Sequence, residues 1–101
     1  MNELRVAPEA EEELAAAVGW YEGRRAELGL ELLVDIDQTL AMIRETPLSA
    51  PLWHADRPYR KKVLRRFPYA IFFRLQGAVV VVDAFAHVRR RPGYWLDLRS
   101  H

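Results

Sequence analysis

The side chains best suited to chemistry are basic and aromatic, and they gather in the C-terminal half of the chain. They are Arg60, Lys61, Lys62, Arg65, Arg66, Arg74, His87, Arg89, Arg90, Arg91, Tyr94 and Trp95. Such a set suits RNA, because arginine and lysine bind phosphates and aromatic rings stack on unpaired bases. It also permits RNA cleavage without a metal: a group that titrates near neutral pH moves protons at the 2′-hydroxyl or the leaving oxygen, while guanidinium groups stabilise the charged phosphate.

The distribution of charge allows a second interpretation of the same residues. Residues 1–50 carry a net charge of −7 and residues 51–101 a net charge of +8. Asymmetry of this kind predicts a polyanion or an acidic protein as the partner of the C-terminal half. It is also explained by attraction between the two halves within the fold, so both interpretations stay open at this point.

Other kinds of site are excluded or disfavoured. The chain has no cysteine, which excludes disulfides, thiolate zinc sites and cysteine nucleophiles and suits a reducing cytoplasm. It has no glycine-rich phosphate loop and no HExxH motif, and its acidic residues lie apart from its histidines, so we expect neither a metal nor a cofactor. No apolar run approaches the ~18 residues of a membrane span, and we expect a cytoplasmic protein without a membrane partner.

The length of 101 residues predicts a single domain over residues 1–101. Residues 3–6 alternate in the manner of a short edge strand. Residues 8–25 predict an amphipathic helix that starts at a proline. A second helix follows with Leu33, Ile36, Leu40 and Ile43 on its buried face, which Leu32 widens, and it ends before Pro47. Two helices joined by a few residues form an antiparallel hairpin.

Three strands are predicted in the second half, over residues 59–67, 70–75 and 79–88, with Gln76-Gly77 as a hairpin loop. The order β-α-α-β-β-β predicts an α+β fold, in which the helical hairpin packs on one face of a small antiparallel sheet. Strict alternation along the last strand places Val80, Val82, Ala84 and Ala86 under the helices. It places Asp83 and His87 on the opposite face, where His87 is either functional or a structural partner of Asp83.

Several segments resemble the RelE/ParE toxin superfamily of bacterial type II toxin–antitoxin systems. The resemblance rests on the order of the elements and covers essentially the whole chain. Its segments are Pro8-Glu9-Ala10-Glu11-Glu12-Glu13-Leu14, Trp20-Tyr21-Glu22, Arg65-Arg66-Phe67-Pro68-Tyr69, Ala84-Phe85-Ala86-His87-Val88-Arg89-Arg90 and Pro92-Gly93-Tyr94-Trp95. The resemblance implies a compact toxin that a co-expressed antitoxin neutralises by wrapping the helices and the basic groove of the sheet.

The resemblance implies two alternative targets. RelE-like members cleave messenger RNA in the ribosomal A site, and the positions here that match their catalytic pattern are Lys62, Arg65, Arg89 and Tyr94. ParE-like members block DNA gyrase, and residues 87–90 are closer to the His-x-Arg pattern of this group. We therefore expect a growth-inhibiting toxin with a preference for the gyrase target, and a metal-independent endoribonuclease as the alternative.

The expected site residues follow from these two interpretations. The catalytic candidates are His87, Arg89, Arg65 and Tyr94. The candidates for binding nucleic acid or another target are Arg60, Lys62, Arg66, Arg74, Arg90, Arg91 and Trp95.

Overall fold

The computed structural model describes residues 2–53, 57–91 and 93–99, so Pro92 of the Pro-Gly-Tyr-Trp segment lies outside the described residues. The expected order of elements is confirmed, with one 3-10 turn added to it, and residues 94–99, expected as a short tail or one helical turn, form a short helix. The elements are β1 (Glu3–Val6), α1 (Pro8–Arg24), α2 (Leu28–Glu45), η1 (Pro47–Ser49), β2 (Arg60–Val63), β3 (Tyr69–Gln76), β4 (Val79–His87) and α3 (Tyr94–Arg99). None of the helices in these ranges combines the length and the apolar character needed to cross a membrane.

The four strands form one sheet in the order β1-β4-β3-β2. Strands β2, β3 and β4 form the expected antiparallel meander, whereas β1 pairs with β4 in parallel, so the sheet as a whole is mixed. The backbone N–H of Asn2 donates to the carbonyl of Arg44 (3.3 Å), which shows that α2 returns the chain to the end of the sheet where β1 starts. Strand β2 starts from that end, and β2, β3 and β4 alternate in direction. Strand β4 therefore runs in the same direction as β1.

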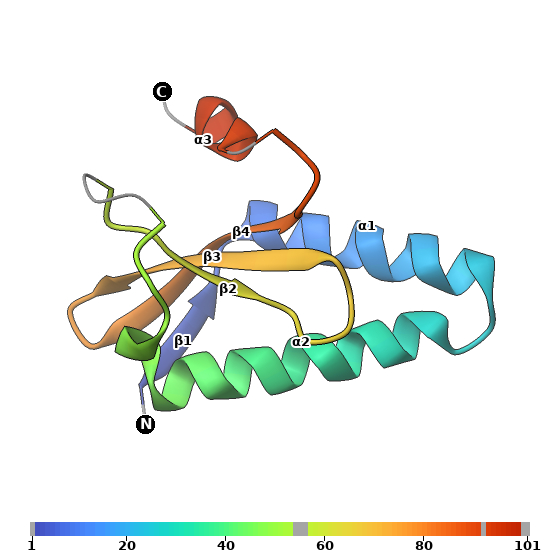
Figure 1. Cartoon of the computed structure of the whole chain (residues 1–101), viewed down its shortest axis with the longest axis horizontal. Helices are drawn as coiled ribbons and strands as arrows, with labels where there is room; N and C mark the ends of the chain where they lie inside the picture. Colours follow the sequence, from blue (N-terminus) through green and yellow to red (C-terminus); the bar gives the residue numbers. More distant parts are fainter. Residues whose placement is uncertain (1, 54–56, 92, 100–101) are drawn as a thin grey trace.

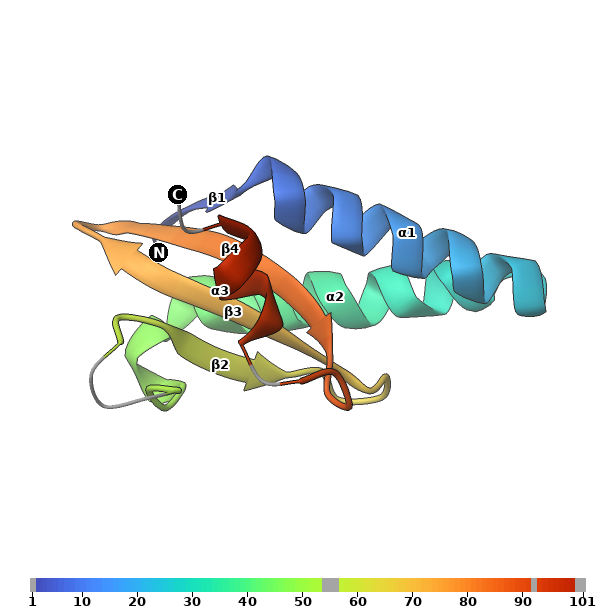
Figure 2. The same ribbon diagram turned by 90° about the horizontal axis from the view of Figure 1, so that it is seen from above.

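The helical hairpin and α3 lie on opposite faces of the sheet (Figures 1 and 2). The larger core lies between the hairpin and the sheet, and α2 contributes Leu32, Ile36 and Ile43 to it. Leu33 was expected in the middle of the buried face, but its side chain is 40% exposed, whereas Leu32, expected only to widen that face, is fully buried. The buried positions of α2 are therefore rotated slightly from those expected.

The second core lies on the other face of the sheet, beneath α3. Here the strands present small side chains and one ring, Ala70, Ala84, Ala86 and Phe72, and Trp95 of α3 covers them. Alanines leave room above a sheet, and the indole ring fills that room. This arrangement contradicts the expected alternation along β4, which placed Ala84 and Ala86 under the helical hairpin.

A β-bulge explains the change of face. Phe72 pairs with Ala84 whereas its neighbour Phe73 pairs with Val82, so Asp83 is the extra residue on β4. A bulge residue reverses the alternation beyond it, which turns Phe85 toward the helices together with Val80 and Val82. The backbone N–H of Phe85 donates to the Glu13 carboxylate at 3.0 Å. Glu13 of α1 thus holds the backbone of β4 just beyond the bulge.

The tight turn between β3 and β4 is displaced by one residue from the expected one. Gln76 pairs with Val79, which leaves Gly77 and Ala78 as the two loop residues. Gly77 has a φ of +63°, the region that glycine enters without steric cost. The turn sets the register that brings Tyr69 opposite His87 at the far end of the hairpin.

Candidate functional site

Two loops that carry arginines meet at one end of the sheet. Residues 64–68 join β2 to β3, and residues 88–93 follow β4. The backbone N–H of Val88 donates to the carbonyl of Pro68 at 2.9 Å, and this bond holds the two loops side by side. Their exposed arginines form a surface that we name the arginine end, namely Arg65, Arg66, Arg89, Arg90 and Arg91.

The first of these loops is fixed by a buried carboxylate. Asp35 of α2 is 3% exposed, and it accepts the backbone N–H groups of Arg65 (3.3 Å), Arg66 (2.8 Å) and Phe67 (3.1 Å). A buried carboxylate is stable only where hydrogen bonds replace its water. Asp35 was not among the residues predicted from the sequence, although an aspartate between the buried positions Leu32 and Ile36 of an amphipathic helix is itself a signal.

Arg66 is committed to an ion pair. Its guanidinium contacts the Glu31 carboxylate at 3.0 Å, and Arg25 reaches the same carboxylate at 3.3 Å. The hydrogen bond from Arg66 is the largest cause that lowers the pKa of Glu31, and Arg25 lowers it further. Arg65, by contrast, makes no ion pair within the described ranges. The two neighbouring arginines therefore differ, with Arg66 anchored and Arg65 available.

His87 lies on the face of the helical hairpin, not on the opposite face as expected. The bulge at Asp83 precedes His87 in β4 and reverses the alternation of the residues that follow it. Its ring meets the edge of Tyr69 at 5.1 Å between centroids. Its Nδ1 accepts the backbone N–H of Arg89 at 3.0 Å, which leaves the proton of the neutral ring on Nε2. The pairing of His87 with Asp83 is wrong, because Asp83 binds Arg74 at 2.7 Å.

Tyr69 joins His87 to the helices through a group of rings. It stacks on Phe85 at 4.7 Å and meets Tyr21 edge-on at 6.1 Å. Burial is the main cause that raises the pKa of Tyr69 to about 12, and Tyr21 and Tyr94 raise it further. The phenol is therefore a neutral packing group at physiological pH.

The raised pKa of Tyr69 predicts a loss of stability in alkali. The pKa of an unfolded tyrosine is about 10, so the contribution of the neutral phenol is fully present below pH 10 and falls as the pH rises toward 12. Denaturant unfolding between pH 9 and pH 12 measures this. We expect Tyr69→Phe to flatten the fall over that interval. Parallel curves for the variant and the wild type would contradict it.

The two C-terminal candidates, Tyr94 and Trp95, differ in exposure. Tyr94 is partly exposed, and the Arg90 guanidinium lies 4.0 Å from the centre of its ring. Trp95 is fully buried and packs against Phe72 (5.1 Å) and Tyr59 (4.9 Å). The expected role of Trp95 in binding a target is incompatible with this position, because no face of its indole is open to a base or a partner.

The basic residues Arg60 and Lys62 of β2 and Arg74 of β3 do not join the arginine end. Arg60 and Lys62 pair with Phe73 and Ile71, so they share the face of the helical hairpin. Arg60 donates to the carbonyl of Ala50 at 2.6 Å and so secures the segment after η1. Arg74 is held by Asp83. These contacts give Arg60 and Arg74 structural roles that the sequence analysis did not foresee.

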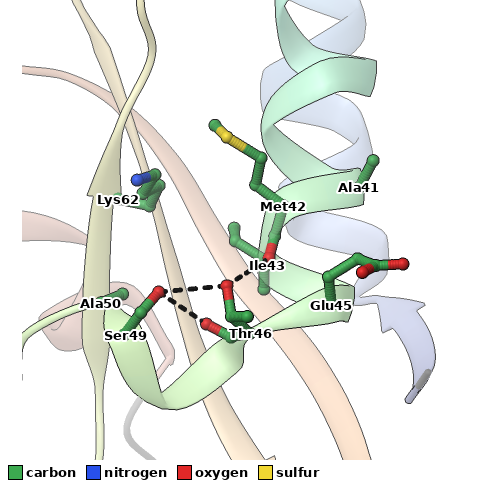
Figure 3. A pocket seen from close by; sticks show the side chains of 8 residues that line it. All are labelled: Ala41, Met42, Ile43, Glu45, Thr46, Ser49, Ala50 and Lys62. Carbon is green, nitrogen blue, oxygen red and sulfur yellow. Dashed lines mark hydrogen bonds between the residues drawn. The ribbon is translucent and has the colours of Figure 1, made fainter.

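Two hollows follow the seam between α2 and the β2 edge of the sheet. One has a volume of about 410 Å³ and lies between the C-terminal turns of α2, η1 and Lys62 of β2, with Met42 on its wall (Figure 3). The other, of about 370 Å³, lies beside Val34, Asp35 and the Arg65–Arg66 pair. Met42 and Val34 are about half exposed. The seam thus presents apolar side chains of the helix beside cationic side chains of the sheet.

The residues that match a RelE-like catalytic pattern are divided by the sheet. Lys62 lies on the face of the hairpin, whereas Tyr94 belongs to α3 on the other face. Arg65 lies beside α2, and within the described ranges Lys62, Arg65 and Tyr94 share no hydrogen bond, ion pair or ring contact. The same ranges contain no group of three or more histidine, aspartate or glutamate side chains that could hold a metal ion.

No family model matches the sequence, and a comparison with curated proteins found no significant match. Solved structures are similar in fold. A chain of the chromosomal ParDE TA system from P. aeruginosa superposes with a TM-score of 0.78 at 21% identity, over 88% of this chain and 98% of that one. The isolated E. coli RelE toxin superposes with a TM-score of 0.64 at 17% identity, over 98% of this chain and 97% of that one. The chain therefore shares the fold of these two solved chains.

Proposed function

We propose that this chain is the toxin of a type II toxin–antitoxin pair and that it inhibits growth in the cytoplasm by binding DNA gyrase through its arginine end. The observation that carries the choice of target is the separation of Lys62 and Tyr94, two of the positions that match the RelE-like catalytic pattern, on opposite faces of the sheet. Phosphoryl chemistry requires its acid, base and cations around one phosphate. A binding surface has no such requirement, and the exposed Arg65, Arg89 and Arg90 at one end of the sheet supply a cationic one.

The chemistry of His87 points in the same direction. Its Nδ1 is occupied by the backbone N–H of Arg89, and one edge of its ring is covered by Tyr69. In this arrangement the imidazole orders the turn that presents Arg89 and Arg90, since the backbone N–H of Arg90 also donates to the His87 carbonyl at 3.0 Å. We assign His87 a supporting role within a docking surface. The fold similarity to the ParDE chain is in keeping with this proposal.

The alternative function is a ribosome-dependent, metal-independent endoribonuclease that cleaves messenger RNA. One observation favours it: Arg90 lies over the ring of Tyr94, so a guanidinium and a phenol do share a site next to Arg89. An arginine beside a tyrosine could bind a phosphate and a stacked base. The fold similarity to the RelE toxin extends over nearly the whole chain.

The proposed neutralising partner is a cognate antitoxin. The seam between α2 and β2 fits an amphipathic segment of net negative charge. Half-exposed Met42 lies beside Lys62 in one hollow (Figure 3), and half-exposed Val34 lies beside Arg65 in the other. Apolar contacts of this kind provide affinity, and the cationic side chains favour an acidic partner over a basic one. A segment that occupied the seam would also cover Arg65.

Controlled expression of the chain separates the two targets. We expect growth arrest with loss of supercoiling in a reporter plasmid and intact messenger RNA. Purified chain should inhibit supercoiling by purified gyrase in the absence of ribosomes. Mapped cuts within translated messages, with normal supercoiling, would instead establish the endoribonuclease. Normal growth under full expression would exclude a toxin of either kind.

A pair of single substitutions tests the roles within the site. Tyr94→Phe removes the hydroxyl that a nuclease needs for proton transfer but keeps the ring under Arg90. We expect it to retain inhibition within about twofold, and Arg89→Ala to weaken inhibition about tenfold. A loss of about 100-fold or more with Tyr94→Phe would favour catalysis and contradict the docking assignment.

A further inference from the structure

We infer that Asp35 is a positioning residue, which sets the potency of the toxin by holding Arg65 at the arginine end. This inference rests on the proposed function, and it concerns a residue that touches no target itself. Asp35 is one of two polar side chains among the described residues that are buried within the core, the other being Thr39. Its carboxylate links α2 to the loop between β2 and β3, and η1 and β2 lie between these two segments in the chain.

The geometry of these bonds gives Asp35 control over the backbone of the loop. Oδ1 accepts the N–H of Arg65, and Oδ2 accepts the N–H groups of both Arg66 and Phe67. Three consecutive N–H groups directed at one carboxylate fix the backbone of residues 65–67 as a unit. Hydrogen bonds to a charged acceptor are stronger than neutral ones, and here they are shielded from water by burial.

The three side chains of residues 65–67 differ in their contacts. Phe67 points into the core, where it meets Tyr21 edge-on at 5.1 Å. Arg66 turns back to Glu31 at 3.0 Å. Arg65 remains, exposed and without an ion pair within the described ranges. The contacts of Phe67 and Arg66, together with the Asp35 carboxylate, therefore fix the position from which the free guanidinium of Arg65 extends.

Preorganisation is the physical advantage of such an arrangement. An arginine on a mobile loop loses backbone and side-chain freedom when it binds, and this loss weakens the complex. With the backbone of residues 65–67 already fixed, only the side chain of Arg65 is ordered on docking. The inference predicts that removing the Asp35 carboxylate weakens binding through Arg65 and through no other contact.

The test is a double-mutant cycle of Asp35→Asn with Arg65→Ala, measured as the concentration that half-inhibits purified gyrase. Asparagine keeps the shape of the side chain but presents an amide N–H₂ to the loop in place of one acceptor oxygen. We expect each single variant to raise the half-inhibitory concentration about tenfold and the double variant to raise it no further. We also expect both single variants to weaken the salt dependence of inhibition equally.

Thr39→Val is the matched control. Thr39 is 2% exposed one turn along α2, and its hydroxyl donates to the backbone carbonyl of Asp35 without reaching the loop. We expect it to lower the melting temperature but to leave the half-inhibitory concentration unchanged. Amide hydrogen exchange of residues 65–67 should accelerate about tenfold or more in Asp35→Asn and not in Thr39→Val.

The outcomes are distinct. If Asp35→Asn loosens the loop but inhibits gyrase as the wild type does, or if its effect adds to that of Arg65→Ala, the inference is wrong while the proposed function stands. If the wild type does not inhibit gyrase, the proposed function fails first. Should Asp35→Asn not fold, Asp35→Glu serves instead, because it keeps the charge but displaces the oxygens by one methylene. The same loss of potency is expected from it, and wild-type potency would overturn the inference.

Discussion

Replacing Trp95 with alanine is expected to lower the free energy of unfolding by about 3–5 kcal/mol, which is the usual cost of truncating a buried tryptophan. The indole is the largest fully buried side chain, and it is the main cover of the sheet face that carries Ala70, Ala84 and Ala86. The short side chains of these alanines cannot fill the volume that the indole leaves. A cavity or an exposed apolar face must therefore remain. Denaturant unfolding of the two proteins measures the difference.

The control for Trp95→Ala is Trp20→Ala. Trp20 is 54% exposed on α1, where the Arg24 guanidinium lies 4.2 Å from its ring, so its removal exposes little new apolar surface. We expect that variant to lose about 1 kcal/mol or less. Equal losses in the two variants would show that α3 is not packed on the sheet in solution.

The elements of this fold were predictable because their residues repeat with a clear period. The 3.6-residue spacing of α1 and α2 and the apolar run of β4 each identified an element, and the short connections implied a meander. The parallel pairing of β1 with β4 was not predictable, since a four-residue strand has no pattern that distinguishes one neighbour from another. It depends on where α2 returns the chain.

The faces of β4 were predicted incorrectly because alternation holds only while the register holds. The apolar run contains nothing that identifies Asp83 as the bulge residue, and the contacts that stabilise the bulge come from distant positions. Glu13 lies 72 residues away in the chain from Phe85, whose N–H it accepts. A single inserted residue thus moved His87 to the face of the helices and left Ala84 and Ala86 under Trp95.

The candidate site was likewise predictable only in part. The sequence places the arginines as a group in the C-terminal half of the chain, and the meander brings five of them, Arg65, Arg66, Arg89, Arg90 and Arg91, to one end of the sheet. The sequence could not show which arginines are held by contacts within the fold. The contacts of Arg60 with Ala50, Arg66 with Glu31 and Arg74 with Asp83 are tertiary, and they remove three of the expected target-binding residues from the set of free cations.

Arg65 and Arg89 carry the largest expected effect on function. Replacing both Arg65 and Arg89 with alanine should raise the half-inhibitory concentration for gyrase about 100-fold, or about 2.7 kcal/mol if each contributes about tenfold and the two are independent. Both side chains are exposed, and within the described ranges neither makes an ion pair. The free energy of unfolding should therefore change by no more than about 0.5 kcal/mol.

The matched control for this pair removes the same charge elsewhere. Arg5 lies on β1 at the opposite edge of the sheet from β2, and Arg24 lies at the end of α1. Arg5→Ala with Arg24→Ala lowers the net charge equally, so any effect of overall charge on association appears in both double variants. We expect the control to inhibit gyrase within about threefold of the wild type. If it is as weak as the Arg65/Arg89 variant, attraction is a property of the whole molecule. If only the Arg65/Arg89 variant is weak, the two loops joined through Val88 and Pro68 form the docking surface.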